Sequence, residues 1–192
     1  SEAEIRRFAG EIHKNANRLL TLINDVIRLS ELDGEKGEER LEPVNLTDIA
    51  RTCVNMLQIN AEKHQVSISF EGENATIMAT KQMAEEVLYN LCDNAIRYNC
   101  AGGSVMVRVR DSQGRVILTV KDTGIGIPKE HQERIFERFY RVDKSHSKKV
   151  GGTGLGLSIV KHAAKLHQAE IALESEPGKG TKVTVVFPGK NG

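Results

Sequence analysis

Three short motifs in this chain carry groups that could together hold a nucleotide at both ends. Asn90 and Asn94 come first, Asp122 then begins a glycine-containing loop, and residues 151–156 form a second glycine-rich loop. Carboxylates accept hydrogen bonds from bases, glycine backbones that enter a helix bind phosphates, and amide oxygens ligate magnesium. Each motif alone is weak evidence, whereas all three in this order are strong evidence for a nucleotide site.

The loop that begins at Asp122 is suited to reading a base. It follows a predicted strand directly, and Gly124, Gly126 and Ile127 lie within it. Adenine offers its exocyclic amino group to a carboxylate, whereas guanine presents a carbonyl oxygen there and would be repelled. Glycine also lets the backbone approach a flat base closely. The alternative is an ordinary Asp-Gly turn that closes a strand.

The second loop is suited to a polyphosphate. Gly152, Gly154 and Gly156 alternate along a segment that runs into a predicted helix. Backbone N–H groups and the positive end of a helix dipole attract phosphates, and a backbone without Cβ atoms can move as a flap. The alternative is a flexible linker. The other residues assigned to this phosphate loop are Thr153, Leu155 and Leu157.

The paired asparagines are suited to a metal ion. Asn90 and Asn94 are spaced i, i+4, so both project from one face of a predicted helix. Their side-chain oxygens are hard ligands that suit Mg²⁺, which also binds the phosphates of a substrate. Arg97 and Tyr98 continue this face and could reach a phosphate. The alternative is that such asparagines only cap or hydrogen-bond a loop.

The segment between the two glycine loops is rich in aromatic side chains. Residues 135–141 hold Phe136, Phe139 and Tyr140, and the chain has only 5 Phe and 3 Tyr in all. We interpret the segment as a small satellite core that anchors the flap.

Outside this aromatic group, three further side chains are candidates for the site. Arg141 and Lys144 could contact phosphates or simply face solvent, and the Thr181 hydroxyl could face the base.

The elements that position these residues follow from apolar spacing. Residues 4–32 are predicted to form one long amphipathic helix, whose narrow stripe favours a partner helix over packing on its own domain. The chain divides into this helical segment at 1–32, a linker at 33–44 and a domain at 45–192. The domain is α+β, with helices covering one face of a mixed, mostly antiparallel sheet. Its predicted helices are 45–63, 81–98 and 155–167, and its predicted strands are 66–70, 75–79, 104–110, 115–121, 169–174 and 181–187.

The bulk composition argues against several other classes of protein. A formal net charge of +1 gives no sign of a basic nucleic-acid surface. The three cysteines lack CxxC spacing, so we interpret them as buried thiols rather than metal ligands or disulfides. No apolar run approaches the roughly 18 residues of a membrane span. The chain opens at Ser1 inside a helical pattern, so we expect a fragment of a longer protein.

Five segments of the chain resemble the conserved boxes of bacterial sensor histidine kinases. They are the N box at 90–98, the G1 box at 122–128, the F box at 136–140, the G2 box at 152–156 and a G3-type box at 178–181. The likeness covers residues 45–188 and implies the Bergerat, or GHKL, fold, a two-layer α/β sandwich that binds ATP. It implies that Asp122 contacts the adenine amino group, that Asn94 with Asn90 serves Mg²⁺, and that the G2 glycines border the triphosphate.

The long helix at 4–32 resembles the second helix of the dimerisation and phosphotransfer hairpin of this family. The family's phosphoacceptor histidine belongs on the preceding helix, in a motif like H-E-x-x-T-P. None of the 6 histidines here is followed by such residues, and His13 lies on the second helix. We therefore expect this fragment to bind ATP but not to phosphorylate itself.

For the whole protein, the resemblance implies transfer of the ATP γ-phosphoryl group to a histidine on an upstream helix. The phosphoryl group would then pass to an aspartate in the receiver domain of a response regulator. The implied cofactors are ATP or ADP and Mg²⁺, and the implied assembly is a homodimer through the helical hairpin. The chain would be a cytoplasmic domain of an inner- or plasma-membrane sensor whose anchor lies upstream. No nucleic-acid partner is expected.

Two other functions remain open from the sequence. A GHKL-fold ATPase related to gyrase, MutL or Hsp90 would need a glutamate general base on the helix of the metal asparagine. In the type II topoisomerase pattern that glutamate lies four residues before the asparagine, where this chain has Asn90. Glu86, one turn earlier, is the remaining candidate base. The second alternative is a non-catalytic nucleotide-binding module that signals by conformation.

Overall fold

The structure, a computed structural model, describes residues 1–34, 41–142 and 152–188. Its helices are α1 (Glu2–Gly34), α2 (Leu46–Lys63), α3 (Lys81–Arg97), α4 (Lys129–Gln132) and α6 (Gly156–Leu166). Its strands are β1 (Glu42–Asn45), β2 (Ser67–Gly72), β3 (Thr76–Ala79), β4 (Ser104–Ser112), β5 (Arg115–Asp122), β6 (Glu170–Glu176) and β7 (Gly180–Phe187). The long helix and the helices and strands expected from apolar spacing are all present, with ends shifted by one or two residues.

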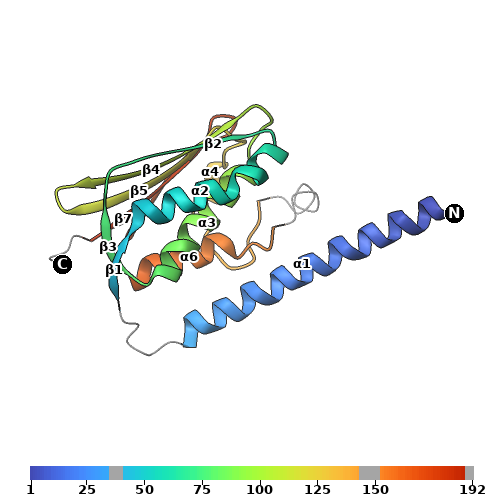
Figure 1. Ribbon diagram of the computed structural model, residues 1–192, viewed down its shortest axis with the longest axis horizontal. Helices are drawn as coiled ribbons and strands as arrows, with labels where there is room; N and C mark the ends of the chain where they lie inside the picture. Colours follow the sequence, from blue (N-terminus) through green and yellow to red (C-terminus); the bar gives the residue numbers. More distant parts are fainter. Residues whose placement is uncertain (35–40, 143–151, 189–192) are drawn as a thin grey trace.

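The main sheet has five strands in the order β2-β4-β5-β7-β6 (Figure 1). The β2–β4 pair is parallel and the other three pairs are antiparallel, which confirms the predicted mixed, mostly antiparallel sheet. In the β5–β7 register, Lys121 lies opposite Lys182. The carboxyl end of the central strand β5 therefore lies beside the start of β7, which brings the G1 and G3-type boxes together.

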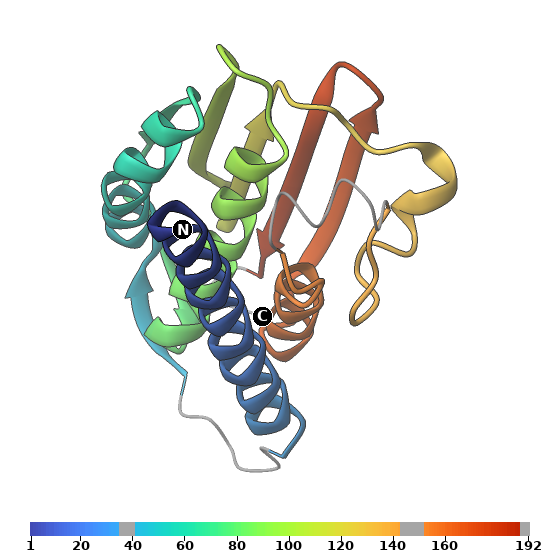
Figure 2. The ribbon, with the colours of Figure 1, turned by 90° about the vertical axis from the view of Figure 1, so that its right-hand side faces the viewer.

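Helices α2, α3 and α6 cover one face of this sheet and form the second layer of the sandwich (Figures 1 and 2). Strand β4 shows why: Val105, Val107 and Val109 are buried against the helices, while Met106 and Arg108 lie on the opposite face. This period of two is the pattern expected for a sheet with one covered face. The two-layer arrangement predicted from the sequence is confirmed.

Side-chain caps fix where two of these helices begin. Asn45 accepts a hydrogen bond from the Asp48 backbone N–H (3.2 Å), and Thr80 accepts one from the Met83 backbone N–H (3.3 Å). Such caps satisfy one of the N–H groups that a helix start leaves unpaired. On α2, Ile59 is 66% exposed, because it lies two residues from buried Leu57 and so projects to the other side of the helix.

Two short elements were not expected from the sequence. Residues 42–44, assigned there to the linker, belong to β1, which pairs antiparallel with β3 and buries Val44 opposite Ile77. The short helix α4 follows Pro128. Linker residues 35–40 lie outside the described residues. Of the three thiols, those of Cys53 and Cys92 are buried, whereas Cys100 is exposed, contrary to expectation.

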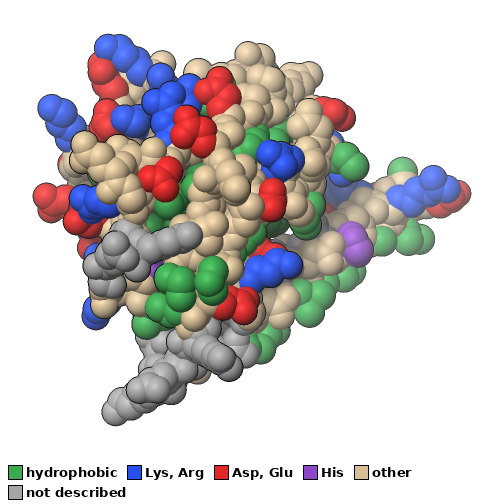
Figure 3. All heavy atoms as spheres, turned by 60° about the vertical axis from the view of Figure 1, so that its left-hand side comes forward, with side chains coloured by type: hydrophobic (Ala, Val, Ile, Leu, Met, Phe, Trp, Pro, Cys, Tyr) green, Lys and Arg blue, Asp and Glu red, His purple; other side chains and the backbone are tan. Residues whose placement is uncertain are grey.

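Helix α1 leaves an uncovered apolar stripe. It contacts α6, and its N-terminal part projects beyond the two-layer body, with hydrophobic side chains along its length (Figures 1 and 3). Ile5, Phe8, Ile12 and Leu19 are each more than half exposed. This is the exposure expected of a helix that lacks a partner. No helix in the described ranges is both long enough and apolar enough to cross a membrane.

Candidate nucleotide-binding site

Asp122 is the last residue of β5, the middle strand of the sheet. Its Oδ1 atom accepts backbone hydrogen bonds from Gly124 (2.8 Å) and Thr181 (3.1 Å). Burial raises the pKa of this carboxyl group above its ordinary value of 3.8, and the two N–H donors oppose the rise. Within the described part of the chain Oδ2 has no hydrogen-bond partner. A half-buried carboxylate with one oxygen held and one available is a specific acceptor for an N–H donor.

The glycines of the G1 loop are required by the packing of the protein itself. A Cβ at Gly124 would overlap the carbonyl oxygen of Tyr98, and one at Gly126 would overlap that of Glu176. Gly126 also has a φ of +67°, which disfavours other residues. Close approach of a base, the reason expected from the sequence, stays a prediction. The described contacts add a second reason, because the loop is pressed between the end of α3 and the β6–β7 turn.

A polar network attaches this loop to the last two strands. Ser175 Oγ accepts the backbone N–H of Ile127 (2.8 Å) and lies 2.8 Å from Thr181 Oγ1. The Gln132 side chain donates to the carbonyls of Ile127 (2.8 Å) and Ser175 (2.9 Å). The expected role of the Thr181 hydroxyl therefore changes. The hydroxyl bonds to Ser175, and it is the Thr181 backbone N–H that bonds to Asp122.

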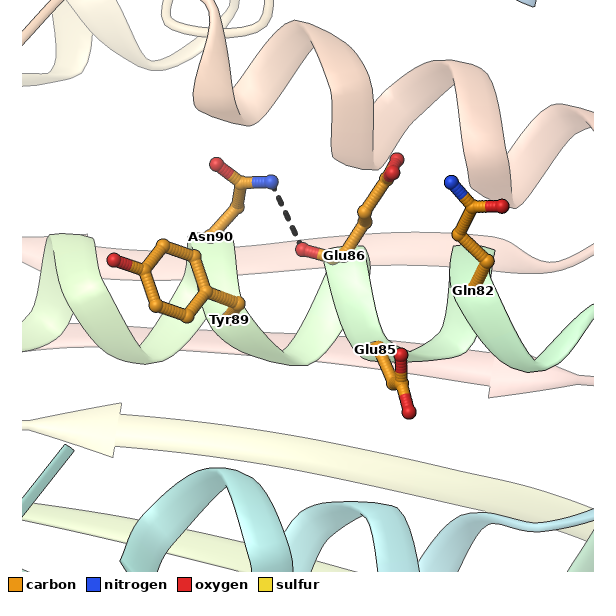
Figure 4. A pocket seen from close by; sticks show the side chains of 5 residues that line it. All are labelled: Gln82, Glu85, Glu86, Tyr89 and Asn90. Carbon is orange, nitrogen blue, oxygen red and sulfur yellow. Dashed lines mark hydrogen bonds between the residues drawn. The ribbon is translucent and has the colours of Figure 1, made fainter. Parts of the chain in front are cut away.

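Asn90 and Asn94 lie on α3 and face the first turn of α6. A Cβ on Gly156 would lie 2.7 Å from Asn90 Oδ1 and 3.6 Å from Asn94 Nδ2, so only glycine leaves this space open. Asn90 donates its amide nitrogen to the Glu86 carbonyl (2.9 Å), as Figure 4 shows. That bond turns Oδ1, the potential metal ligand, toward the glycine loop. Asn90 Oδ1 fits Mg²⁺, which takes oxygen ligands and also binds phosphates, whereas the Asn94 atom nearest Gly156 is its amide nitrogen.

The part of the G2 loop that the structure describes packs on the F box. Gly154 has a φ of +78°, and a Cβ there would lie 2.9 Å from the carbonyl carbon of Phe139. The Phe139 N–H donates to the Gly154 carbonyl (2.9 Å). Thr153 Oγ1 accepts the N–H of Leu155 (3.3 Å), and Leu155 is fully buried. The loop is thus anchored at its helical end.

Of the remaining predicted site residues, two lie beside the G2 loop and the others do not contact it in the described contacts. Tyr98 and Arg141 both lie beside Gly152, because a Cβ there would be 3.5 Å from Tyr98 Oη and 3.9 Å from Arg141 Nη2. Arg97 instead forms an ion pair with Asp93 on its own helix (2.6 Å). Leu157 packs against the core. Lys144 lies outside the described residues.

The F box forms a satellite core only in part. Ile135 is buried, and Tyr140 bonds to His131 Nδ1 (2.6 Å) and stacks under the Arg134 guanidinium (4.3 Å to the ring centre). Phe139, by contrast, is 58% exposed and has a φ of +61°. A positive φ is uncommon for a large aromatic residue. This residue therefore contributes a strained, exposed turn rather than a core side chain.

A pocket of about 400 Å³ adjoins the asparagine pair on α3. Its lining residues are Gln82, Glu85, Glu86, Tyr89 and Asn90 (Figure 4). The Glu86 side chain points from α3 toward α6, one turn before Asn90. The position four residues before Asn94 thus carries an amide rather than a carboxylate, as the sequence indicated. Asn90 links this pocket to the candidate metal site.

Together, the fold and these residues define a GHKL-type ATP-binding domain. Helices cover one face of a mixed sheet, a carboxylate ends the central strand, and an asparagine pair faces a glycine loop. The family described as "Histidine kinase-, DNA gyrase B-, and HSP90-like ATPase" matches residues 79–191, more than half of the chain. The chain therefore belongs to this family.

Among relatives and solved structures, the similarity is to histidine kinases. The "Sensor-like histidine kinase SenX3" of Mycolicibacterium smegmatis is 38% identical over 185 residues, which cover 96% of this chain and 48% of the relative. The structure of full-length ShkA in complex with AMPPNP matches 96% of this chain and 38% of ShkA, with 27% identity and a TM-score of 0.82. Histidine kinase ThkA, solved in complex with response regulator protein TrrA, shares the fold (23% identity, TM-score 0.73, 97% of this chain and 52% of ThkA).

These matches place the chain in this ATPase-like family and show that it is similar to sensor histidine kinases. The chain spans about half the length of the SenX3 relatives it matches.

Proposed function

We propose that this domain binds ATP with Mg²⁺ and presents the γ-phosphoryl group to a histidine of the same kinase. The observation that carries the proposal is the half-buried Asp122 carboxylate, fixed on one oxygen by two backbone N–H groups. Its other oxygen would accept the adenine amino group. The AMPPNP complex of ShkA, a relative with 27% identity, supports a nucleotide at this site.

Each group of residues has a separate task in the proposal. Asp122 selects adenine, and the backbone of Gly152 to Gly156 borders the phosphates, with Tyr98 and Arg141 beside Gly152. Asn90 and Asn94 would hold Mg²⁺, which when bound neutralises phosphate charge. Phosphoryl transfer depends chiefly on positioning and charge stabilisation, and this set of residues supplies both.

The phosphoacceptor we propose is a histidine on a helix that precedes this sequence. That helix would pair with α1, complete the hairpin and form a homodimer. The partner of this homodimer would be the receiver domain of a response regulator. ThkA, a protein of this fold, is solved in complex with response regulator protein TrrA, which supports such a partner. We also propose that the whole protein is a membrane-anchored sensor with this domain in the cytoplasm.

Phosphorylation of the full-length protein tests this proposal directly. Incubation with ATP labelled on the γ-phosphate is expected to give an acid-labile, base-stable phosphohistidine, and this fragment alone is expected to give none. An assay of phosphate release distinguishes the proposed kinase from the ATPase alternative, for which Glu86 is the candidate general base. Robust steady-state turnover by the fragment, abolished in Glu86→Gln, would favour hydrolysis over phosphotransfer. Nucleotide binding without phosphohistidine in the full-length protein would favour the conformational module.

Adenine recognition is expected to weaken in mild acid. Because burial raises the Asp122 pKa, the folded protein binds this proton more tightly than the unfolded chain does. The proton therefore stabilises the folded state, and that contribution is lost as pH rises from the ordinary value through the raised one. The affinity for ATP changes in the opposite direction and falls as pH falls, because the protonated carboxyl group has one acceptor oxygen fewer for the adenine amino group. The ratio of ATP affinities, wild type over Asp122→Asn, should fall as pH falls through the raised pKa; a flat ratio would contradict this.

The exposed stripe of α1 is expected to cause self-association. Wild-type chain should sediment as a dimer at micromolar concentration, and Phe8→Asp with Ile12→Asp should make it a monomer. The matched control is Met56→Asp with Ile59→Asp on α2, where the side chains are equally exposed. Sedimentation velocity measures the outcome. A strictly monomeric wild type whose α1 amides resist hydrogen exchange would show that the helix needs no partner.

A further inference from the structure

Ser175 lies at the centre of the network that supports Asp122, yet no sequence motif marks it. Its hydroxyl is half-buried on β6 and has three partners: Ile127 N at 2.8 Å, Thr181 Oγ1 at 2.8 Å and Gly180 O at 3.0 Å. A serine hydroxyl has one proton and two acceptor sites. All three contacts are satisfied when Ser175 donates to the Gly180 carbonyl and accepts from Ile127 and Thr181.

The Gly180 carbonyl and the Thr181 N–H belong to one peptide unit. In a trans peptide these two groups point in opposite directions. Ser175 holds the carbonyl end, and the N–H end donates to Asp122 Oδ1 at 3.1 Å. Hydrogen bonds connected in this way polarise one another, so the first strengthens the second.

Glycine is required on the β7 side of this contact. Gly180 has a φ of +94°, and a Cβ there would overlap the backbone carbonyl oxygen of Asp122. Gly180 therefore has no side chain that could help to orient its own peptide. The β6–β7 ladder pairs Gly180 with Glu176 and Thr181 with Ser175. The Ser175 hydroxyl adds a side-chain hydrogen bond to this peptide.

The same hydroxyl also holds the loop that begins at Asp122. Ile127 donates its N–H to Ser175 and accepts from Gln132 through its carbonyl (2.8 Å), so both of its backbone groups are paired. Gln132 also donates to the Ser175 carbonyl (2.9 Å). The G1 loop and the peptide that holds Asp122 are therefore tied to one point on β6.

We propose that Ser175 is a positioning residue for adenine selection, acting on Asp122 through the Gly180–Thr181 peptide. It touches no nucleotide itself. Its hydroxyl sets the direction of the Thr181 N–H, which fixes Asp122 Oδ1 and leaves Oδ2 aimed at the exocyclic amino group. The inference rests on the proposed adenine-binding role of Asp122.

The test compares two nucleotides that differ only in that amino group. Calorimetry measures the affinity for ATP and for purine riboside triphosphate, which lacks the 6-amino group, both with Mg²⁺. Ser175→Ala is expected to weaken ATP binding about tenfold, which corresponds to the loss of one charge-linked hydrogen bond. Its affinity for the analogue should stay within about twofold of the wild-type value. Ser175→Thr keeps the hydroxyl and should restore most of the ATP affinity. Ser69→Ala on the opposite edge strand is the matched control and should change neither.

A double-mutant cycle separates positioning from structural support. Ser175→Ala added to Asp122→Asn should cost no further ATP affinity, because the two residues act through one contact. Equal losses for both nucleotides, unchanged ATP affinity in Ser175→Ala, or additive losses in the cycle would each overturn the inference. If Ser175→Ala unfolds, Ser175→Cys, with a weaker hydrogen-bonding group of similar size, should show the same selective loss. A wild type that binds neither nucleotide would instead refute the proposed function and the inference with it.

Discussion

Replacing Asp122 by asparagine is expected to lower ATP affinity by roughly 10- to 100-fold, the value of a charge-assisted hydrogen bond in a partly desolvated site. The amide oxygen can still accept from Gly124 and Thr181, so the loop keeps its backbone bonds. The amide nitrogen then faces the adenine amino group, and two donors oppose each other. Guanine presents an acceptor at that position, so GTP should lose less affinity or gain some. Isothermal titration with ATP, GTP and purine riboside triphosphate measures all three changes.

The control for this substitution is Asp111→Asn near the end of β4. It makes the same chemical change at an exposed carboxylate that caps Gly114 (3.1 Å), away from the candidate site. Its ATP affinity should equal that of the wild type. The Asp122→Asn protein should also be at least as thermally stable as the wild type near neutral pH, since it removes a charge whose burial is unfavourable. Lower stability together with equal losses for every nucleotide would mean that Asp122 supports the fold rather than the base.

Replacing Asn94 by alanine is expected to remove most of the Mg²⁺ dependence of ATP binding. The side chain lies with Asn90 against Gly156, where an amide oxygen can share a cation with the phosphates. Loss of a metal ligand should reduce phosphohistidine formation in the full-length protein by about 100-fold or more. Mutation of residues that only hydrogen-bond to metal ligands already lowers metal affinity or activity by about 10- to 100-fold. Titrations with and without Mg²⁺, and the rate of phosphohistidine formation, measure the two effects.

The matched control is Asn55→Ala on the exposed face of α2. It removes the same amide from a helix without touching the G2 loop, and both measurements should stay at the wild-type values. If Asn94→Ala keeps the full enhancement of ATP binding by Mg²⁺, the asparagine pair is a structural feature of α3. The magnesium part of the proposal would then be wrong.

The fold was largely predictable because its elements have clear periodicity. The buried row Val105, Val107 and Val109 has the period of a half-covered strand, and Asn45 is a recognisable cap. Strand β1 was missed because four residues that include Pro43 carry too little pattern. Its stability depends on pairing with β3, and pairing over a distance in sequence is not visible in local spacing.

The candidate site was predictable where one side chain carries the chemistry. Asp122 and the asparagine pair stand in short motifs, and the fold brings each beside its expected glycine loop. Ser175 and Gln132 were missed because serine and glutamine are common in exposed strands and turns. Their role depends in part on contacts with residues 43 to 48 positions away, which local spacing does not show. The reason for glycine at 124 and 126 was also hidden, since it depends on carbonyls of α3 and the β6–β7 turn.

Adenine recognition at Asp122 is tested most directly by calorimetric titration of the wild-type chain with ATP and with GTP in the presence of Mg²⁺. We expect saturable binding of one ATP per chain, and GTP binding weaker by at least about tenfold because a carboxylate opposes the guanine carbonyl. Absence of measurable ATP or ADP binding, or equal affinities for ATP and GTP that Asp122→Asn leaves unchanged, would contradict it.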